Sequence, residues 1–599
     1  MKYYCNPINI NYRYQFNADQ RNNRIAICRE AADPSMISFK GRYYIFASMT
    51  LGYWVSDDLV NWENKRLPDS LPLYDYAPDV RVLGDYVYFC ASKKGEACDR
   101  FRTRDIENGP YEKIEGTFDY WDPNLFVDDD GRVYFYWGCA NNTPIWGVEL
   151  DKDTMEPLGE KVDLIFGHPE KHGYERVGEN NSKLPKSEEE VEAAFQYFIK
   201  NIGTPLEQIP PYYIPMIKGM FTDRPYIEGA WMDKHEGRYY LQYAFAGTQF
   251  NTYGDGVYVG DSPLGPFEPA KNNPYSYHPG GFMPGAGHGS TMADKYGNLW
   301  HTATMRISVN HDFERRVGLW PAGFDKDGEL FCNQRYGDWP IAVSGDGQLD
   351  PWQDPDWMLL SYKKTVTASS NTEGHEPKLL ADESVQSCWQ AASNALDEWV
   401  QMDLGKTYDV RAVQVNFADV NIEIPVPGQI RGTTQARYIE EVNTVTRYLL
   451  EGSIEGENYF VIEDKTEADS DLSHDFIVKE EGLQVRYLRL SKMQVPYEQA
   501  PSVSGLRVFG IELGTKCAQA DYTVDRTTGI DMEVSIEPVE GAVGYNILWG
   551  HSREKLYHSY MSFENELRVG ALVEGQSYYV RVDSFNESGI TTGKVSFIE

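Results

Sequence analysis

Long apolar runs are missing from this 599-residue chain. No stretch approaches the roughly 18 consecutive apolar residues that a membrane-spanning helix needs, and the mean hydropathy is −0.53. Hydrophobic residues still make up 41% of the sequence and aromatic residues 14%, which is enough to fill packed cores. We therefore expect a globular protein without a membrane partner.

Positive charge is also scarce. The chain has 56 Lys and Arg residues against 91 Asp and Glu residues, which gives a formal net charge of −35 and a pI near 4.7. A strongly acidic surface repels the phosphates of nucleic acids and of anionic lipids. The charge thus argues against a nucleic-acid or anionic-membrane partner and leaves a neutral or cationic ligand open.

Cysteines are few, and none of the eight forms a CxxC pair or another spacing typical of a zinc site. We expect buried free thiols. The opening residues, MKYYCNPINI, lack the basic segment followed by an apolar segment that a signal peptide needs. Both observations favour a cytoplasmic location, with a secreted or periplasmic location as the alternative if a leader has been removed.

A repeated hairpin organises the first 345 residues. Each copy has a glycine turn followed by an alternating aromatic strand, which is typical of an antiparallel hairpin. The turn glycines Gly41, Gly84 and Gly131 follow one another at steps of 43 and 47 residues, close to the period of about 40 to 50 for a propeller blade. The copies are FKGRYYIFAS at Phe39, VLGDYVYFCAS at Val82, DDDGRVYFYWG at Asp128, HEGRYYLQYA at His235 and DKYGNLWHTATM at Asp294.

A second strand pair follows each copy, so the pattern predicts five four-stranded blades and an all-β fold, namely a five-bladed β-propeller over residues 1–345. The longest step, from Gly131 to Gly237, has room for one blade and an insertion at about 167–221. The segment KSEEEVEAAFQYFIKNI within it spaces its apolar residues as a short helix does.

The pattern changes after residue 345, where 346–358 reads as a linker. Residues 359–514 resemble the discoidin-type β-sandwich of coagulation-factor C domains and of many carbohydrate-binding modules. Residues 515–599 resemble a fibronectin type III sandwich, on YNILWG at Tyr545 and YYVRVDSFNESG at Tyr578. The residues that carry the discoidin resemblance are Trp389, Trp399, Val400, Asp403, Leu404, Gly405, Val413, Arg486, Tyr487, Arg489 and Leu490.

Polar residues recur at the start of the first strand of each predicted blade. A propeller gathers these strands around one axis, so we expect the side chains to meet at one face. Carboxyl groups that share a pocket have pKa values that move apart, which lets one act as an acid and another as a base in glycoside hydrolysis. The residues are Asp33, Asp79, Asp122, Glu228 and His288.

The segments around three of these carboxylates, ADPSMISFKGRYYIFAS, WDPNLFVDDDGRVYFYWG and IEGAWMDKHEGRYYLQYA, resemble glycoside hydrolase family 43. The resemblance implies that Asp33 is the general base, that Asp122 tunes the pKa and orientation of the acid, and that Glu228 is the general acid. It also implies that no cofactor is required. Departures include Gly229-Ala230-Trp231, where many relatives have Gly-Pro-His.

Two further residues match functional positions of the family. His288, in GAGHGSTM, matches an axial histidine that often lies near a bound calcium or sodium ion, and Arg306, in HTATMR, matches an arginine that often contacts sugar hydroxyls. A buried polar role for His288 stays open. Asp79 has either a pocket role or a structural one. The acidic turn at 128–130 lacks the ligand spacing of a calcium loop and reads as an ordinary hairpin turn.

Aromatic residues are candidates for sugar stacking, because a sugar ring packs against an aromatic face. Trp121 and Trp231 are singled out because they neighbour the proposed catalytic carboxylates in sequence, and Tyr53 and Trp54 are included as further candidates. Most of the other aromatic residues must pack the blades.

The resemblance implies an inverting, exo-acting glycoside hydrolase. The expected product is a terminal pentose, α-L-arabinofuranose or β-D-xylose, released from a plant-type oligo- or polysaccharide. Inversion requires about 6.5 to 9.5 Å between the Asp33 and Glu228 carboxyl groups, whereas a separation of about 5 Å would indicate retention. The alternatives are a β-D-galactofuranosidase of the same family and a non-catalytic carbohydrate-binding protein.

Overall fold

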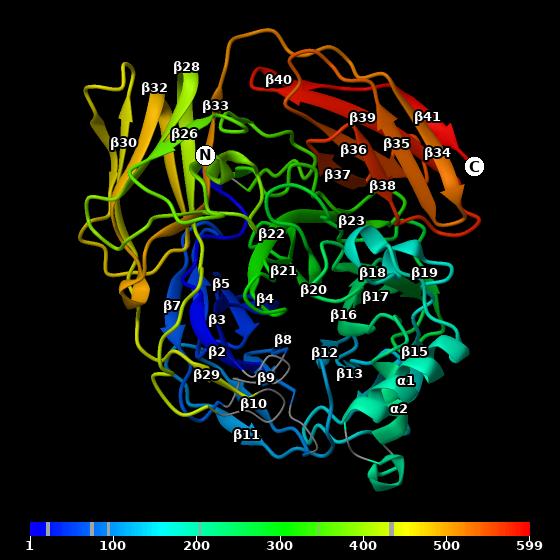
Figure 1. Cartoon of the computed structure of the whole chain (residues 1–599). Coiled ribbons are helices and arrows are strands. Elements are labelled where there is room, and N and C mark those ends of the chain that lie inside the picture. Colours follow the sequence, from blue (N-terminus) through cyan, green and yellow to red (C-terminus); the bar gives the residue numbers. More distant parts are fainter. Residues whose placement is uncertain are drawn as a thin grey trace.

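The computed structural model describes residues 1–19, 24–71, 77–92, 96–202, 205–211, 213–345, 347–430 and 436–599. Within these ranges the chain is nearly all β-structure, with a ring of short sheets below two larger β-sandwiches (Figure 1). Among the described helices, none has the length and apolar character that a membrane crossing requires. The predicted all-β fold is confirmed.

Five four-stranded antiparallel sheets form the propeller in the described part of the chain. Blade 1 has β4 (Ala32–Phe39), β5 (Arg42–Ser48), β6 (Gly52–Ser56) and β7 (Glu63–Arg66), and blade 2 has β8 (Asp79–Leu83), β9 (Tyr86–Cys90), β10 (Arg100–Thr103) and β11 (Glu112–Ile114). Blade 3 has β12 (Asn124–Val127), β13 (Val133–Trp137), β14 (Ile145–Leu150) and β15 (Val162–Ile165), and blade 4 has β16 (Glu228–His235), β17 (Arg238–Phe245), β18 (Gly254–Gly260) and β19 (Phe267–Pro269). Blade 5 has β20 (Gly287–Ala293), β21 (Leu299–Arg306), β22 (Arg315–Phe324) and β23 (Leu330–Cys332).

The hairpin glycines are required by the backbone and not by crowding. Gly41 and Gly237 have φ values of 81° and 83°, in the left-handed region that favours glycine, and each follows a residue that also has positive φ, as a two-residue type I′ turn demands. A Cβ atom added at either glycine would meet nothing within 4 Å. The turn geometry alone therefore fixes these positions.

One residue with positive φ also precedes or opens the first strand of every blade, and at three blades a register shift in the strand pairing accompanies it. These five residues mark the equivalent place in the five blades. They are Asp33, Ala77, Asp122, Gly229 and His288, with φ values of 49°, 51°, 50°, 62° and 51°. Asp79 lies two residues beyond this place, which corrects the predicted alignment of Asp79 with the other carboxylates.

The residue two positions further on links neighbouring blades. Ser35 Oγ accepts the backbone N–H of Val80 at 3.0 Å, and Asp79 Oδ2 accepts that of Leu125 at 2.7 Å. In the same way, the Asn124 side chain accepts a hydrogen bond from the backbone N–H of Met232 at 2.8 Å, and the Ser290 hydroxyl accepts one from the backbone N–H of Met36 at 2.9 Å. Four of the five blade junctions are thus tied by the same hydrogen bond.

Asp79 belongs to this ring and not to an open pocket. It is 3% exposed, it also accepts a hydrogen bond from Asn124 Nδ2 at 3.0 Å, and burial raises its pKa to about 6. The structure supports the structural interpretation of this carboxylate.

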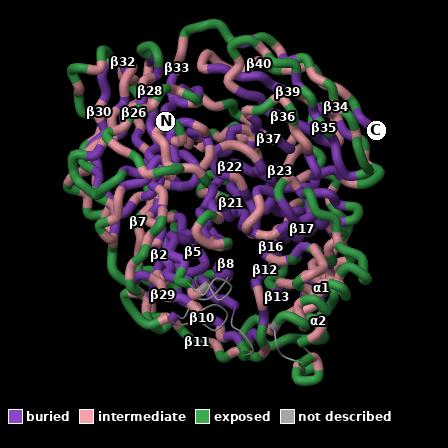
Figure 2. The backbone as a smooth tube through the Cα atoms, viewed as in Figure 1, coloured by how far each residue is buried: buried purple, intermediate pink, exposed green. Residues whose placement is uncertain are grey.

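The insertion between blades 3 and 4 carries the expected helix as α1 (Glu188–Ile202), followed by α2 (Tyr213–Gly219). Ser187 and Glu190 form a capping box, since each side chain accepts the other residue's backbone N–H, at 3.3 and 2.8 Å. Both helices are largely exposed at the rim of the propeller (Figure 2). Short 3₁₀ turns η1 (Gly173–Glu175), η2 (Glu179–Asn181) and η3 (Leu206–Gln208) complete the insertion.

The first sandwich is an eight-stranded sheet system of the discoidin type. Its strands are β25 (Met358–Leu359), β26 (Thr365–Ala368), β27 (Trp389–Gln390), β28 (Trp399–Phe417), β30 (Arg447–Ser453), β31 (Phe460–Asp464), β32 (His474–Gln494) and β33 (Ser502–Ile511). Between β28 and β30 the chain leaves the sandwich, and β29 (Arg437–Ile439) pairs with β2 (Arg13–Asp19), which pairs with β3 (Arg24–Glu30). β1 (Lys2–Tyr4) pairs with β24 (Ile341–Val343).

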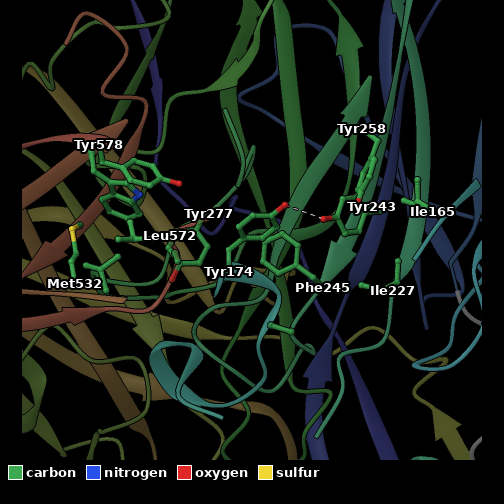
Figure 3. Packing of buried hydrophobic residues seen from close by; sticks show 14 of the residues in the cluster. Ile165, Tyr174, Ile227, Tyr243, Phe245, Tyr258, Tyr277, Met532, Leu572 and Tyr578 are labelled. Carbon is green, nitrogen blue, oxygen red and sulfur yellow. Dashed lines mark hydrogen bonds between the residues drawn. The ribbon is translucent and has the colours of Figure 1, made fainter. Parts of the chain in front are cut away.

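The C-terminal sandwich has two sheets, one with β34 (Tyr522–Thr528), β35 (Asp531–Ile536) and β38 (Glu566–Val569), the other with β36 (Gly544–Gly550), β37 (His558–Ser562), β39 (Tyr578–Asn586), β40 (Gly589–Thr591) and β41 (Val595–Ile598). Its likeness to fibronectin type III stays a prediction. Its core continues into blade 4 through Tyr174 of the insertion, whose hydroxyl lies 3.3 Å from that of Tyr243 (Figure 3).

Candidate active site

Three carboxylates meet a histidine at one end of the propeller axis. Asp33 lies in β4, Asp122 lies two residues before the start of β12, Glu228 opens β16, and His288 lies in β20. The His288 Nδ1 atom lies 3.5 Å from Asp33 Oδ1 and 3.8 Å from Asp122 Oδ2. Asp33 and Asp122 are buried, whereas Glu228 is partly exposed. The blade geometry thus collects four residues that are up to 255 positions apart.

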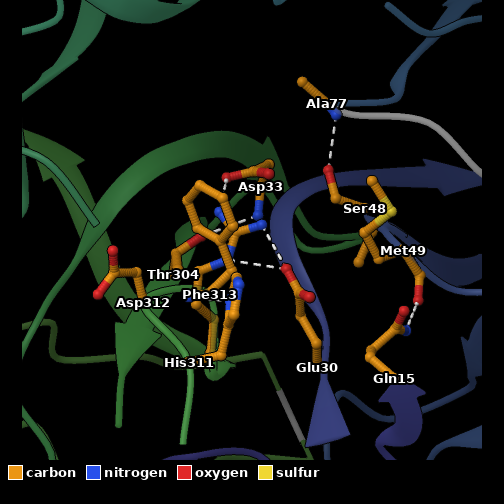
Figure 4. Close-up of polar contacts among 12 residues, drawn as sticks. Gln15, Glu30, Asp33, Ser48, Met49, Ala77, Thr304, His311, Asp312 and Phe313 are labelled. Atoms are coloured by element: carbon orange, nitrogen blue, oxygen red, sulfur yellow. Dashed lines mark hydrogen bonds and ion pairs between the residues drawn. The ribbon is translucent and has the colours of Figure 1, made fainter. Parts of the chain in front are cut away.

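Asp33 is held as an anion. Its backbone N–H donates to Thr304 Oγ1 at 2.8 Å (Figure 4), which fixes the strained residue in place, and Arg315 Nη1 lies 3.1 Å from its Oδ1. Burial acts to raise the pKa of Asp33, but Arg315, His288 and the Ser48 hydroxyl outweigh it and hold the pKa below its usual value. An ionised carboxylate in this position can accept a proton.

Asp122 has the opposite character. Burial raises its pKa to about 7, and the neighbouring Glu228 and Asp33 carboxylates add to this shift, while His288 opposes it. Its Oδ2 accepts the backbone N–H of Gly229 at 3.4 Å. Gly229 has to be glycine, because a Cβ atom there would lie 2.8 Å from the His288 ring. Asp122 can thus share a proton with its neighbours near neutral pH.

Two side chains that the sequence did not single out orient Glu228. The Tyr253 hydroxyl donates to Glu228 Oε1 at 2.7 Å, and the Cys139 thiol donates to Oε2 at 3.2 Å. Ligand atoms of Asp122, Cys139 and Glu228 all lie within 4.8 Å of one another. Cys139 lies two residues after the end of β13, which places it at the same edge of blade 3 as Asp122. This position relative to the predicted strand is the sequence signal that could have indicated Cys139.

The eight cysteines all lie among the described residues, and all are free; seven are buried, and Cys139 is partly exposed. The predicted free thiols are therefore present, and one of them has a place in the site.

Asp255 holds the backbone of His288 in place. The Asp255 carboxylate accepts the backbone N–H of His288 at 2.7 Å and that of Gly289 at 3.0 Å, and it contacts His301 Nε2 at 3.1 Å. Burial acts to lower the pKa of His288, but Asp33, Asp122 and Glu228 outweigh it and raise the pKa. The imidazolium form is thereby favoured, and it neutralises part of the negative charge of the site.

The residues around His288 fit a cation only in part. Calcium prefers six to eight oxygen ligands. Among the described residues, the group that could hold a metal ion is formed by Asp122, Cys139 and Glu228, and His288 is not a member. An ion next to the exposed part of His288 would depend mainly on water for its ligands. The axial calcium or sodium ion stays a prediction from the resemblance.

Arg437 of the discoidin-type module is connected to Asp33 through three ion pairs. Glu30, at the end of β3, accepts from Arg315 Nε at 3.0 Å through Oε1, and from Arg437 Nη1 at 2.8 Å through Oε2. All these side chains are buried. Since Arg315 also contacts Asp33, the four residues form a continuous chain of alternating charges, Arg437–Glu30–Arg315–Asp33.

The propeller sequence matches a known family. Residues 25–177 and 206–330 match the model described as glycosyl hydrolases family 43, and residues 365–423 match that of the F5/8 type C domain. The chain carries a family 43 domain. The resemblance stated from the sequence is confirmed for these two domains.

Relatives of the family 43 domain differ in their named activities. The chain is 27% identical over 222 residues to "Xylosidase/arabinosidase 43A" of Humicola insolens, covering 35% of this chain and 58% of the relative. It is 22% identical over 271 residues to "Beta-D-galactofuranosidase xynD" of Aspergillus niger, covering 39% and 62%. The chain thus spans about three fifths of these relatives. A solved thermostable family 43 glycoside hydrolase is 20% identical, covers 59% of this chain and all of its own, and has a TM-score of 0.39.

Three of the predicted sugar-stacking residues do not lie at the surface of the family 43 domain. Tyr53 and Trp54 are 2% and 0% exposed. Tyr53 stacks on Phe46 within the packing of blades 1 and 2, and Trp54 donates its indole N–H to Asn11 at 2.8 Å. Trp231 is 3% exposed. These aromatic residues pack the blades, which corrects their assignment as sugar platforms.

Trp231 takes the fifth place in the ring of blade junctions, where the other blades have Ser35, Asp79, Asn124 and Ser290. The Arg81 guanidinium lies 3.3 Å from the centre of its ring system, and Arg81 Nη2 donates to the carbonyl of Met232 at 2.9 Å. A cation–π contact thus covers this side chain. The departure of this chain at Gly229-Ala230-Trp231 therefore has a structural role.

Trp121 and Arg306 remain candidates for substrate contacts. Trp121 is partly exposed and lines a cavity of about 540 Å³ together with Cys139. Arg306 ends β21, whose antiparallel pairing with β20 brings this end to the His288 edge. Its guanidinium contacts the carbonyl of Gln249 at 3.2 Å and the half-exposed Glu179 at 3.0 Å. A sugar hydroxyl would have to compete with Glu179 for Arg306.

Proposed function

We propose that the family 43 domain is an inverting, exo-acting glycoside hydrolase that releases a terminal pentose from an oligo- or polysaccharide. The observation that carries this proposal is the electrostatic difference between two neighbouring carboxyl groups. Two cations hold Asp33 ionised, whereas Asp122 beside Glu228 has a pKa of about 7. An ionised base, Asp33, and a pair of carboxyl groups that can share a proton, Asp122 and Glu228, therefore coexist in one site, as acid–base hydrolysis requires.

In the proposed reaction a water molecule attacks the anomeric carbon while Asp33 removes one of its protons. The bond from the anomeric carbon to the glycosidic oxygen breaks, and Glu228 gives its proton to that oxygen. Both steps belong to one displacement, so the configuration at the anomeric carbon inverts. Asp122, whose pKa is raised to about 7, can share a proton with its neighbours, while Tyr253 and Cys139 fix the orientation of the Glu228 carboxyl group.

The names of the relatives support α-L-arabinofuranose or β-D-xylose as the released sugar. A β-D-galactofuranosidase is the second candidate, because one relative bears that name over 39% of this chain. A non-catalytic carbohydrate-binding protein is the third. Binding of carbohydrate by the F5/8 type C domain is also a proposal, made from the resemblance to carbohydrate-binding modules.

A panel of aryl glycosides tests this proposal directly. We expect release of the aryl group from 4-nitrophenyl α-L-arabinofuranoside or β-D-xyloside. Because a single displacement inverts the anomeric centre, a β-xyloside should first give α-xylose, observed by proton NMR before mutarotation. Release from the galactofuranoside alone would favour the second candidate. A first-formed product with retained configuration, or no release from any member of the panel, would overturn the proposed mechanism.

The charge chain from the discoidin-type module gives a second expected result. Arg437→Met removes one of the two arginines that contact Glu30, so Arg315 is drawn toward Glu30 and stabilises the Asp33 carboxylate less. The pKa of Asp33 should rise, and the acid limb of the pH profile of kcat/KM should move to higher pH by about half to one unit.

The matched control is Arg486→Met, which removes an arginine of the same module that pairs with Asp403 at the surface. It should leave the acid limb in place. Thermal unfolding of both variants shows whether the fold is intact. A lower kcat for Arg437→Met with an unchanged pH profile would show that Arg437 only stabilises the fold.

A further inference from the structure

A groove along blade 3 leads away from the general acid. It has a volume of about 540 Å³, within the range of about 300 to 1,000 Å³ that is usual for small-molecule sites. We call it the blade 3 groove and define it by six of its lining residues. They are Phe118, Trp121, Trp137, Cys139, Trp146 and Lys161.

The blade 3 groove is continuous with the catalytic carboxyl group. Cys139 lines it and also donates its thiol hydrogen to Glu228 Oε2 at 3.2 Å. Trp121, which also lines the groove, directly precedes Asp122. A general acid delivers its proton to the leaving group. The groove that adjoins Glu228 therefore lies where the leaving-group portion of a substrate would extend.

The walls of the groove suit sugar rings. Trp146 and Phe118 are partly exposed, and they pack against the buried Trp137, whose ring lies 6.0 Å from that of Trp146 and 5.1 Å from that of Phe118. Aromatic faces of this kind pack against the apolar faces of pyranose rings. Lys161, an exposed side chain, places its ammonium group 3.9 Å from the Trp146 ring and can donate hydrogen bonds to hydroxyl groups.

The charges at the groove favour a neutral occupant. Lys161 and the exposed Asp119 both line it, so the groove presents charge of both signs, while the whole chain has a formal net charge of −35. An acidic polysaccharide would be repelled over longer distances. A neutral chain of pyranose sugars is the ligand class that meets both the aromatic walls and the charges.

We propose that the blade 3 groove binds the leaving-group portion of a neutral pyranose polysaccharide or oligosaccharide, and that it makes this protein selective for chains over small glycosides. This inference rests on the proposed function, because it assigns the leaving-group side from the role of Glu228. It adds a second recognition surface to the pocket that holds the terminal sugar.

The test compares two substrates with the same terminal sugar, an aryl glycoside and an oligosaccharide of at least four sugars. Trp146→Ala removes a partly exposed wall of the groove. We expect its loss of kcat/KM on the oligosaccharide to exceed its loss on the aryl glycoside by about tenfold, because one lost stacking contact lowers binding on the leaving-group side. Tyr197→Ala, which removes a 73% exposed aromatic residue of α1, is the matched control and should change neither value.

Binding without turnover gives an independent readout. Calorimetric titration of the oligosaccharide into Glu228→Gln should show binding that weakens about tenfold when Trp146→Ala is added. Lys161→Met is the second variant if Trp146→Ala unfolds early, and it should weaken the same binding without removing an aromatic wall.

The outcomes separate this inference from the proposed function. Wild-type protein that cleaves the aryl glycoside, together with equal losses on both substrates for Trp146→Ala and Lys161→Met, would overturn the groove and leave the hydrolase standing. Wild-type protein that cleaves neither substrate would overturn the hydrolase itself, and the leaving-group assignment of the groove would fall with it.

Discussion

Replacement of Asp33 by asparagine is expected to lower kcat/KM by about 10² to 10⁴-fold on every glycoside that the protein cleaves. The amide cannot take a proton from water, whereas the carboxylate is kept ionised for this task by Arg315 and His288. The loss should not depend on the leaving group, because the missing step is the activation of water. Steady-state kinetics on aryl glycosides with leaving groups of different pKa measure this directly.

The control for Asp33→Asn is Asp69→Asn, which makes the same change of charge at an aspartate whose side chain is 98% exposed. Its kcat/KM should match that of the wild type. A loss of less than about tenfold for a folded Asp33→Asn protein would remove Asp33 from the role of general base.

Glu228→Gln is expected to show the second large effect. The glutamine cannot donate a proton, so an oligosaccharide, whose leaving alcohol has a high pKa, should lose about 10² to 10⁴-fold in kcat/KM. An aryl glycoside with a good leaving group departs without a proton and should lose much less. In Glu228→Gln the amide oxygen can accept from the Tyr253 hydroxyl, and the amide N–H can donate to the Cys139 sulfur, so the side chain can keep its place and the two substrates can be compared.

The leaving-group dependence separates the two carboxyl groups. Plots of log kcat/KM against the leaving-group pKa should be steeper for Glu228→Gln than for the wild type and unchanged in slope for Asp33→Asn. Equal losses on good and poor leaving groups would count against Glu228 as the acid.

The propeller could be predicted because its signals are local. A glycine with positive φ at each hairpin and a strand of alternating aromatic residues are properties of about ten consecutive residues. The repeat of this pattern gives the number of blades. The candidate carboxylates Asp33, Asp122 and Glu228 could be proposed for the same reason, since each lies eight or nine residues before the turn glycine of such a hairpin.

The register at the start of the strands could not be predicted in the same way. The segments EAADPSM and YAPDVRV look alike, but the residue with positive φ is Asp33 in the first and Ala77 in the second. An irregular pairing of one or two residues moves a side chain from the axis to the blade junction. The sequence alone therefore aligns Asp79 with the candidate catalytic carboxylates, although Asp79 ties blade 2 to blade 3.

Long-range partners gave no signal at all. Arg437 lies 407 positions from Glu30, and Arg315 lies 282 positions from Asp33. No periodicity connects such residues, and their contact depends on how the modules pack. The local sequence also does not separate buried from exposed aromatic residues. Trp54 and Trp121 look alike in sequence, yet Trp54 fills a core and Trp121 lines a groove.

Strand β29 makes the discoidin-type module a structural part of the propeller. The sandwich that contributes β29 gives the propeller both an edge for β2 and a buried partner for Glu30. A different sandwich grafted at residue 358 would leave β2 with an open edge and Glu30 with less compensation for its burial. The discoidin-type module is therefore not an interchangeable attachment, and a successful replacement would have to bring its own strand and its own arginine.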